Sequence, residues 1–347
     1  MALDTHPHAA AVLRSGLVAG PSHAYLFTGP AGSGKRAAAR EFAVELLGER
    51  TRVESGAHPD LTWVTPSGAH DMVRSDVAEA VVSASSRTPF EASRRVFVLE
   101  RVDTMNDEAA NTLLKTLEEP PSYVVLILLT DRPGQVLPTI ASRCQAVRFD
   151  PAPPEVIAAR LPIDGDAALA CARLALGDAE RAALLASPAG AALREAAQGL
   201  VRNGDWRPLL AAGNARAVVA REALERARDE ELTFLSKKDQ RRRSSEYDDR
   251  IKRAERRART DAIDHVLQLA GLWLRDLACV DAGAPELAHN ADRGTELAAG
   301  AAGRSSAALR TALELVEETR TRFLLNVSED LALEALSFRL QRTLTVV

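Results

Sequence analysis

The stretch AYLFTGPAGSGKR, Ala24–Arg36, joins a short apolar run to a glycine-rich loop. The loop fits the phosphate-binding pattern G-x-x-x-x-G-K-[ST] except at its last position, where Arg36 replaces the hydroxyl residue. In such loops backbone N–H groups surround phosphate oxygens, the lysine reaches the β- and γ-phosphates, and the hydroxyl holds Mg²⁺. The residues expected to form a phosphate cradle are Gly29, Gly32, Gly34 and Lys35. A plain glycine turn between strand and helix is the alternative.

Strand-like and helix-like segments alternate along the first 150 residues. The expected strands are Ala24–Thr28, Asp60–Thr65, Arg95–Glu100, Val124–Thr130 and Ala146–Phe149. Several of them are near-continuous apolar runs, as in parallel strands that are buried on both faces. The clearest helix follows Asn106, which can cap it, and stops at Pro120. This alternation, with a phosphate loop after the first strand, predicts an open α/β nucleotide-binding domain.

An ATPase of this type also needs an acidic centre at the end of a second buried strand. There an aspartate holds Mg²⁺ and a neighbouring glutamate activates water. In VFVLERVD, Glu100 takes the metal-ligand position and Arg101 takes the position of the base. Arginine stays protonated and cannot accept a proton, and Asp103 lies beyond the expected strand end. Arg36 and Arg101 together predict a protein without intrinsic ATPase activity.

The pattern changes after residue 150, where DPAPP, Asp150–Pro154, indicates a linker. Helical Leu and Ala periodicity follows, without a strand pattern. A chain of 347 residues is long enough for two or three domains. We expect a nucleotide-binding domain over residues 1–150, a small helical domain over 151–190 and a larger helical domain over 191–347.

The segment at about residues 237–259 differs from its surroundings because it is strongly basic. It holds eleven Lys and Arg against five acids, a local charge of +6. Such a run is typical of a long solvated helix or an insertion. Contact with nucleic-acid phosphates is the alternative, with Tyr247 as its one aromatic residue.

Bulk composition narrows the class of protein. The formal net charge is −4, so the chain as a whole is not a polyanion binder. Its cysteines, Cys144, Cys171 and Cys279, are few and far apart, which favours a reducing compartment and no zinc or other metal site. No apolar run approaches the roughly 18 residues of a membrane span. We expect a soluble cytoplasmic protein.

Several motifs resemble the bacterial AAA+ clamp-loader family in order and spacing. They are HAYLFTGPAGSGK (His23–Lys35), HPD (His58–Asp60), VFVLERVDTMNDEAANTLLKTLEEPP (Val96–Pro121) and LPTIASRCQAVRF (Leu137–Phe149). Farther on, WLRDL (Trp273–Leu277) and NVSEDLALEALSFRL (Asn326–Leu340) resemble the helical collar domain of that family. The resemblance implies an AAA+ domain, a helical lid domain and a collar that takes part in oligomerisation.

The resemblance also assigns roles to single residues. Arg143, in Ser142–Cys144, matches an arginine that enters the nucleotide site of the neighbouring subunit and assists hydrolysis there. Thr130 stands where the family places a polar sensor, although a strand terminus explains it equally well. The lid-domain sensor arginine falls on Glu180, with Arg181 one residue out of register. The span before HPD holds no cysteine, so the four-cysteine zinc module of many members is not expected.

The resemblance therefore implies a clamp-loader subunit that holds ATP or ADP without hydrolysing it. Its expected partners are ATPase motor and clamp-opening subunits, and through them a sliding clamp and primed DNA. The assembly belongs to a DNA-directed DNA polymerase, a nucleotidyltransferase. The alternatives are an active motor ATPase of the same loader and a nucleic-acid-binding protein that acts through residues 237–259.

Overall fold

The computed structural model describes residues 6–66, 72–233, 237–323 and 327–345. The chain divides into two compact units. The first comprises Met1–Pro153 with Gly177–Ala179, and the second comprises Pro154–Leu176 with Glu180–Val347. The chain leaves the first unit within the predicted linker, while a separate lid domain ending near residue 190 stays a prediction.

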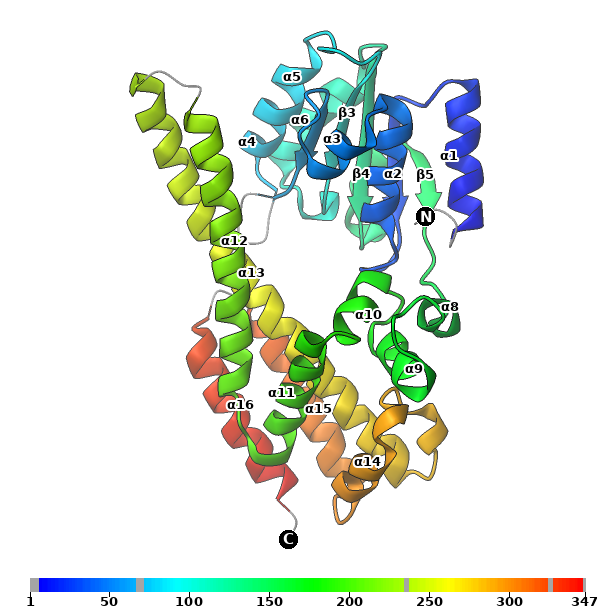
Figure 1. Cartoon of the computed structure of the whole chain (residues 1–347), viewed down its shortest axis with the longest axis vertical. Coiled ribbons are helices and arrows are strands. Elements are labelled where there is room, and N and C mark those ends of the chain that lie inside the picture. The colour runs from blue at the N-terminus through cyan, green and yellow to red at the C-terminus, as the bar shows by residue number, and fades with distance from the viewer. Residues whose placement is uncertain (1–5, 67–71, 234–236, 324–326, 346–347) are drawn as a thin grey trace. The chain divides into compact units, whose positions relative to one another are not determined.

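A five-stranded sheet forms the centre of the first unit (Figure 1). Its strands are β1 (Ala24–Thr28), β2 (Leu61–Val64), β3 (Arg95–Leu99), β4 (Val124–Thr130) and β5 (Gln145–Arg148). They lie in the order β2-β3-β4-β1-β5, and every neighbouring pair is parallel. The predicted α/β fold is confirmed, with strand ends shifted by at most one residue. Because β1, β3 and β4 are adjacent, the loops after them meet at one edge of the sheet.

Helices cover both faces of this sheet. They are α1 (Pro7–Ala19), α2 (Lys35–Leu47), α3 (Arg50–Ser55), α4 (Arg74–Val77), α5 (Ser83–Ser85), α6 (Asp107–Glu118) and α7 (Pro138–Ala141), with a π-helical turn η2 (Ala78–Val82) between α4 and α5 and 3-10 turns η3 (Val102–Thr104) and η4 (Pro133–Gln135). Alternate side chains of β1 enter opposite cores: Phe27 packs with α1 and α2, and Leu26 packs with α6 and α7. Asn106 caps α6 as predicted, its Oδ1 accepting from Ala109 N at 2.9 Å.

The second unit is helical throughout its described residues. Its helices are α8 (Pro154–Ala158), α9 (Gly165–Leu174), α10 (Ala179–Leu185), α11 (Pro188–Asn203), α12 (Arg207–Leu232), α13 (Lys237–Asp281), α14 (Gly294–Ala301), α15 (Ser306–Phe323) and α16 (Glu329–Leu344), with 3-10 turns η5 (Pro285–Leu287) and η6 (Ala291–Arg293). The motif at Trp273–Leu277 lies in α13. The motif that starts at Asn326 forms α16, although Asn326 itself lies outside the described residues. Among the described helices, none combines the length and apolar character needed to cross a membrane.

The basic segment 237–259 forms the first half of α13, which packs along α12 as a long helical hairpin (Figure 1). Tyr247 and Ile251 are buried in this hairpin. The one aromatic residue of the segment is therefore part of a hydrophobic seam and cannot stack on a nucleobase. Among the residues with described side chains, Lys252, Arg253 and Arg256 are at least partly exposed.

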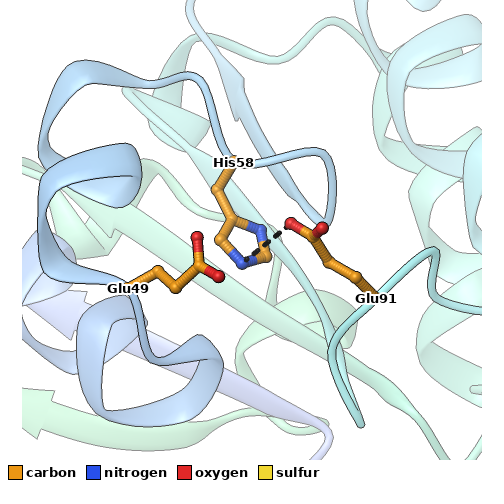
Figure 2. Close-up of side chains that lie close together, drawn as sticks. All are labelled: Glu49, His58 and Glu91. Atoms are coloured by element: carbon orange, nitrogen blue, oxygen red, sulfur yellow. Dashed lines mark ion pairs between the residues drawn. The ribbon is translucent and has the colours of Figure 1, made fainter.

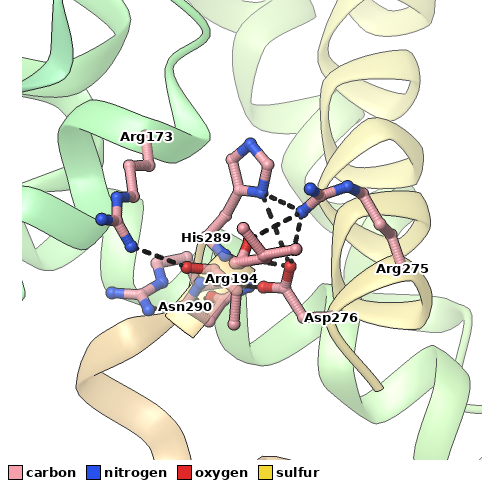
Figure 3. A network of polar contacts seen from close by, with 8 residues as sticks. Arg173, Arg194, Arg275, Asp276, His289 and Asn290 are labelled. Carbon is pink, nitrogen blue, oxygen red and sulfur yellow. Dashed lines mark hydrogen bonds and ion pairs between the residues drawn. The ribbon is translucent and has the colours of Figure 1, made fainter. Parts of the chain in front are cut away.

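A polar network holds residues 288–293 against α11 and α13 (Figure 3). Arg194, buried on α11, donates to both carboxylate oxygens of Asp292, at 2.9 and 2.7 Å, and to Asn290 Oδ1 at 3.0 Å. Asp276, on α13, accepts from the backbone N–H groups of His289 and Asn290 at 2.9 and 2.8 Å. Burial alone would raise the pKa of Asp276, but these donors hold it below its usual value.

Candidate nucleotide site

The phosphate loop turns the chain from β1 into α2 with three glycines at positive φ. Gly29, Gly32 and Gly34 have φ values of 152°, 75° and 79°. A side chain at Gly29 is also excluded by space, because its Cβ would lie 2.1 Å from the carbonyl oxygen of Phe149. Only glycine meets these backbone requirements at low cost. The predicted cradle residues therefore adopt a defined loop, and phosphate binding there stays a prediction.

Lys35 points its ammonium group back into this loop. The Nζ atom donates to the carbonyl oxygens of Gly29 and Pro30, both at 2.7 Å, and to Ser33 Oγ at 3.2 Å. It also forms a 2.7 Å ion pair with Asp131, the residue after β4. The side chain is 7% exposed. Its charge is therefore neutralised by the chain itself, and a phosphate would have to take the place of Asp131.

The two positions that would hold a metal in an active enzyme meet in one ion pair. Arg36 Nε lies 2.7 Å from Glu100 Oε1, so the residue in place of the hydroxyl contacts the carboxylate in the metal-ligand position. Trp63, on β2, donates its indole N–H to the same Glu100 oxygen. The guanidinium carbons of Arg36 and Arg40 lie 5.9 and 5.2 Å from the centroid of the Trp63 ring. Each distance is in the range of cation–π attraction.

These residues do not fit a magnesium ion. In a hydrolysing P-loop protein, Mg²⁺ is held by the hydroxyl after the lysine and by the carboxylate of the second strand. Arg36 has no oxygen to offer and carries a positive charge at that place. One oxygen of the Glu100 carboxylate, Oε1, already contacts Arg36 and accepts from Trp63.

Arg101 occupies the predicted position of the catalytic base. Arg101 begins the turn η3 with φ 54°, a left-handed conformation that costs a non-glycine residue roughly 1–2 kcal/mol. Asp103, in that turn, accepts from Thr130 Oγ1 at 2.8 Å. Thr130 therefore ends β4 with a contact to Asp103, and its role as a sensor stays a prediction.

Sequence reasoning missed two further groups at the loop. The His6 ring packs edge-on against Phe149, 5.1 Å between centroids, and its Nε2 would lie 3.1 Å from a Cβ at Gly34. Burial lowers the pKa of His6 below its usual value. Asp178, in the same compact unit, lies against Gly32, where an added Cβ would be 2.1 Å from its own Cβ. Neither residue belongs to a recognisable motif. Each reaches the loop only when the chain folds, so the sequence alone gives no sign of it.

Arg143 lies after α7 and is partly exposed. Its Nη2 forms a 2.9 Å ion pair with Glu118 Oε1 at the end of α6, and its Nη1 donates to the Thr139 carbonyl oxygen at 2.9 Å. The exposed fraction of the side chain is 37%. These contacts are to α6 and α7, so among the described residues the structure does not join Arg143 to the phosphate loop of its own chain.

His58 of the HPD motif lies in a separate polar cluster, where it approaches Glu49 and Glu91 (Figure 2). Their nearest N and O atoms lie within 4.8 Å, a grouping that could suit a metal ion. However, Arg52 Nη1 contacts both carboxylates, at 2.8 and 2.7 Å. His58 Nδ1 accepts the Asp60 N–H at 3.1 Å, which places the ring proton on Nε2, the nitrogen that faces Glu91. The cluster is therefore best described as an ion-pair network around Arg52.

A second function of HPD is to fix the loop that leads into β3. Asp60 is fully buried. Its Oδ1 accepts from Phe90 N at 2.6 Å, and its Oδ2 accepts from Glu91 N and Ala92 N, both at 2.9 Å. The motif thus positions the backbone before β3 rather than taking part in the phosphate loop.

The arginine nearest to the predicted lid-sensor position makes a contact within the helical unit. Arg181, one residue out of register with the sensor pattern, donates to Gln268 Oε1 at 2.6 Å within the helical unit. No nucleotide role can be derived from that bond, and the identity of a lid sensor stays a prediction.

Comparisons with known proteins show what the first part of the chain resembles. Residues 6–153 match the family described as "DNA polymerase III, delta subunit". The delta' subunit of Bacillus subtilis is 38% identical over 165 residues, 44% of this chain and 49% of that protein. The delta' subunit of Pseudomonas aeruginosa is 40% identical over 136 residues, 35% of this chain and 42% of that protein. The chain thus spans about half the length of these curated relatives.

A solved structure extends the likeness of fold to the helical part. The DNA polymerase III gamma subunit-related protein of Thermotoga maritima aligns over 97% of this chain and 100% of its own, with a TM-score of 0.54 and 16% identity. At that identity the likeness concerns fold alone. It agrees with the predicted combination of a P-loop α/β domain and a helical remainder. Over residues 6–153, the chain is similar to DNA polymerase III delta subunits, and its similarity to delta' members confirms the clamp-loader resemblance of its motifs.

Proposed function

We propose that this chain is a delta prime-like, cytoplasmic clamp-loader subunit that does not hydrolyse ATP and lends Arg143 to a neighbouring ATPase subunit. In that assembly it would join ATPase motor and clamp-opening subunits and help to load a sliding clamp on primed DNA. The proposed absence of hydrolysis rests chiefly on the 2.7 Å ion pair between Arg36 and Glu100. It joins the two positions from which an active enzyme holds its metal.

Three requirements for hydrolysis fail together at this site. No hydroxyl follows Lys35, the Glu100 carboxylate is engaged by Arg36 and Trp63, and Arg101 stands in the place of the base. A metal ion and a positioned base each lower the barrier by several kcal/mol in P-loop enzymes. An active motor ATPase, the first alternative, would need both.

Arg143 is suited to act on another subunit because its own contacts are weak. An exposed ion pair such as the one with Glu118 is worth about 0–1 kcal/mol, since solvent screens both charges. A γ-phosphate offers more charge and two oxygens that can accept from both arms of the planar guanidinium fork. Exchange of Glu118 for phosphate therefore costs little, while the charge of the arginine is always present.

The test is the ATPase rate of the reconstituted complex with Arg143→Ala in this chain. An arginine supplied in trans is worth on the order of 10³-fold at the site that it serves, so the total rate should fall by that site's share. Arg143→Lys should rescue little, because an ammonium lacks the planar fork. Gel filtration should show an intact complex. Unchanged turnover in the intact complex would remove the trans-acting role.

Glu118→Gln serves as the matched variant. It removes the charge that holds Arg143 on its own subunit and leaves the arginine in place. The complex should keep its full ATPase rate or gain slightly. A fall as large as that of Arg143→Ala would instead mean that the ion pair itself, through local structure, governs the rate.

A further inference from the structure

We propose that the phosphate loop takes a nucleoside polyphosphate without a divalent cation, because the Arg36 guanidinium stands where the metal would. This deepens the proposed absence of hydrolysis and rests on the same ion pair. The ligand is defined by its chemistry: a chain of two or three phosphates, which a loop of backbone N–H groups and Lys35 can accept.

The guanidinium is oriented beside the loop by its contacts with Glu100 and Trp63. Arg36 is in the first turn of α2, directly after Lys35. Its Nε is held by Glu100, whose oxygen is also held by the Trp63 indole, and the guanidinium lies near the face of that ring. A cation that is already oriented next to a phosphate loop supplies charge at a smaller entropy cost than an unconstrained side chain.

The same group keeps donors for a phosphate. A guanidinium carries five N–H bonds, and the contact with Glu100 is made by its Nε, so both terminal nitrogens can face phosphate oxygens. The Arg36 side chain is 59% exposed, so those nitrogens are accessible. An added magnesium ion would meet a like charge there, and its usual carboxylate would already be engaged.

A bound polyphosphate must also displace two internal acids, Asp131 at Lys35 and Asp178 against Gly32. Lys35 is paired with Asp131, whose side chain is 43% exposed and can turn outward. The ion pair between Arg36 and Glu100 would persist, because the Glu100 side chain is only 16% exposed. Replacement of Asp131 by phosphate therefore makes Lys35 available to the ligand, while Arg36 stays paired with Glu100 beside it.

Calorimetric titration of the full chain tests the proposal with ATP, ADP and tripolyphosphate, each in EDTA and in excess Mg²⁺. We expect binding in EDTA, with affinity unchanged or weaker when Mg²⁺ is present. Binding of all three probes would assign recognition to the phosphates, and binding of only the nucleotides would add contacts to the base or sugar. Lys35→Ala should abolish binding in both buffers.

The decisive variant is Arg36→Ser, which restores a hydroxyl and removes the cation. Its affinity in EDTA should fall at least tenfold, and magnesium should then strengthen rather than weaken binding. Arg40→Ser is the matched control, since Arg40 lies over the same Trp63 ring one turn farther along α2. It should behave like the unmodified chain, and circular dichroism should show equal folding of all variants.

Two outcomes would overturn the proposal: binding that Mg²⁺ strengthens tenfold or more in the unmodified chain, or no binding of any probe in either buffer. Neither outcome touches Arg143, whose role is measured in the assembled complex. Magnesium-dependent hydrolysis by the isolated chain would instead remove the proposed function itself.

Discussion

At the scale of single residues, Asp60 shows how a buried charge can organise backbone. Three N–H groups of residues 90–92 converge on its carboxylate. Burial alone would raise the pKa of Asp60, but these donors and Arg95 lower it below its usual value. Because the folded pKa lies below the unfolded one, the stabilisation is complete above the unfolded pKa and is lost as pH falls through the folded pKa.

Asp60→Asn should therefore destabilise the first unit at neutral pH by roughly 1–3 kcal/mol, since an amide turns one acceptor into a donor that faces N–H groups. In this variant the free energy of unfolding should also fall less steeply as the pH drops below about 4. Urea unfolding across that range measures both effects. Asp107→Asn, at an exposed acid in the first turn of α6, is the comparison, and an equal slope in both variants would contradict the assignment.

The residues of the site show how far sequence can lead at this scale. Arg36, Glu100 and Arg101 are recognisable as departures from an ATPase pattern, because each occupies a fixed position in a motif. The ion pair between Arg36 and Glu100 is not predictable in the same way. It depends on Trp63, which comes from another strand and belongs to no motif, and on the exact rotation of α2 over the sheet.

At the scale of elements, the α12–α13 hairpin shows why a charge run is a poor guide to function. The sequence predicted a helix or an insertion, and the segment is a continuous part of a long helix. Its apolar residues, Tyr247 and Ile251, are too sparse among charges to give a clear periodic pattern, yet they form the seam with α12.

Tyr247→Ala should loosen this hairpin by about 3 kcal/mol, because it removes a buried ring. Hydrogen exchange should report the change as faster exchange confined to α12 and the first half of α13. Lys252→Ala, at an exposed position on the same helix, should leave exchange unchanged. Equal protection in the two variants would mean that the tyrosine does not hold the hairpin together.

The cations on the solvated face of α13 allow a direct test of nucleic-acid binding. We expect that combined alanine substitution of Lys252, Arg253 and Arg256 leaves the salt dependence of duplex DNA binding by the isolated chain unchanged. If these side chains did bind phosphates, removal of each one would reduce the slope of log affinity against log salt by about 0.9. A slope smaller by two or more such steps would favour the nucleic-acid alternative.

At the scale of the whole molecule, the proposed absence of hydrolysis rests on residues at three places: the start of α2, the end of β3 and the turn η3. Repair of one element should therefore not restore function. The isolated chain should show no ATPase turnover above background, and Arg36→Thr should show none either, because Arg101 still occupies the place of the base. Phosphate release with and without primed DNA measures this. DNA-stimulated turnover that Lys35→Ala abolishes would contradict it.

Trp63 gives the phosphate loop an optical consequence. The chain has three tryptophans, and the other two, Trp206 and Trp273, belong to the helical unit. The indole of Trp63 is hydrogen-bonded to Glu100 and lies beside two guanidinium groups, so its emission depends on the charges around it. A phosphate group placed beside that ring would change the charges around it, and we expect the emission to change with them. Trp63 emission would then report occupancy of the loop, and Trp206→Phe with Trp273→Phe would isolate that signal without a label.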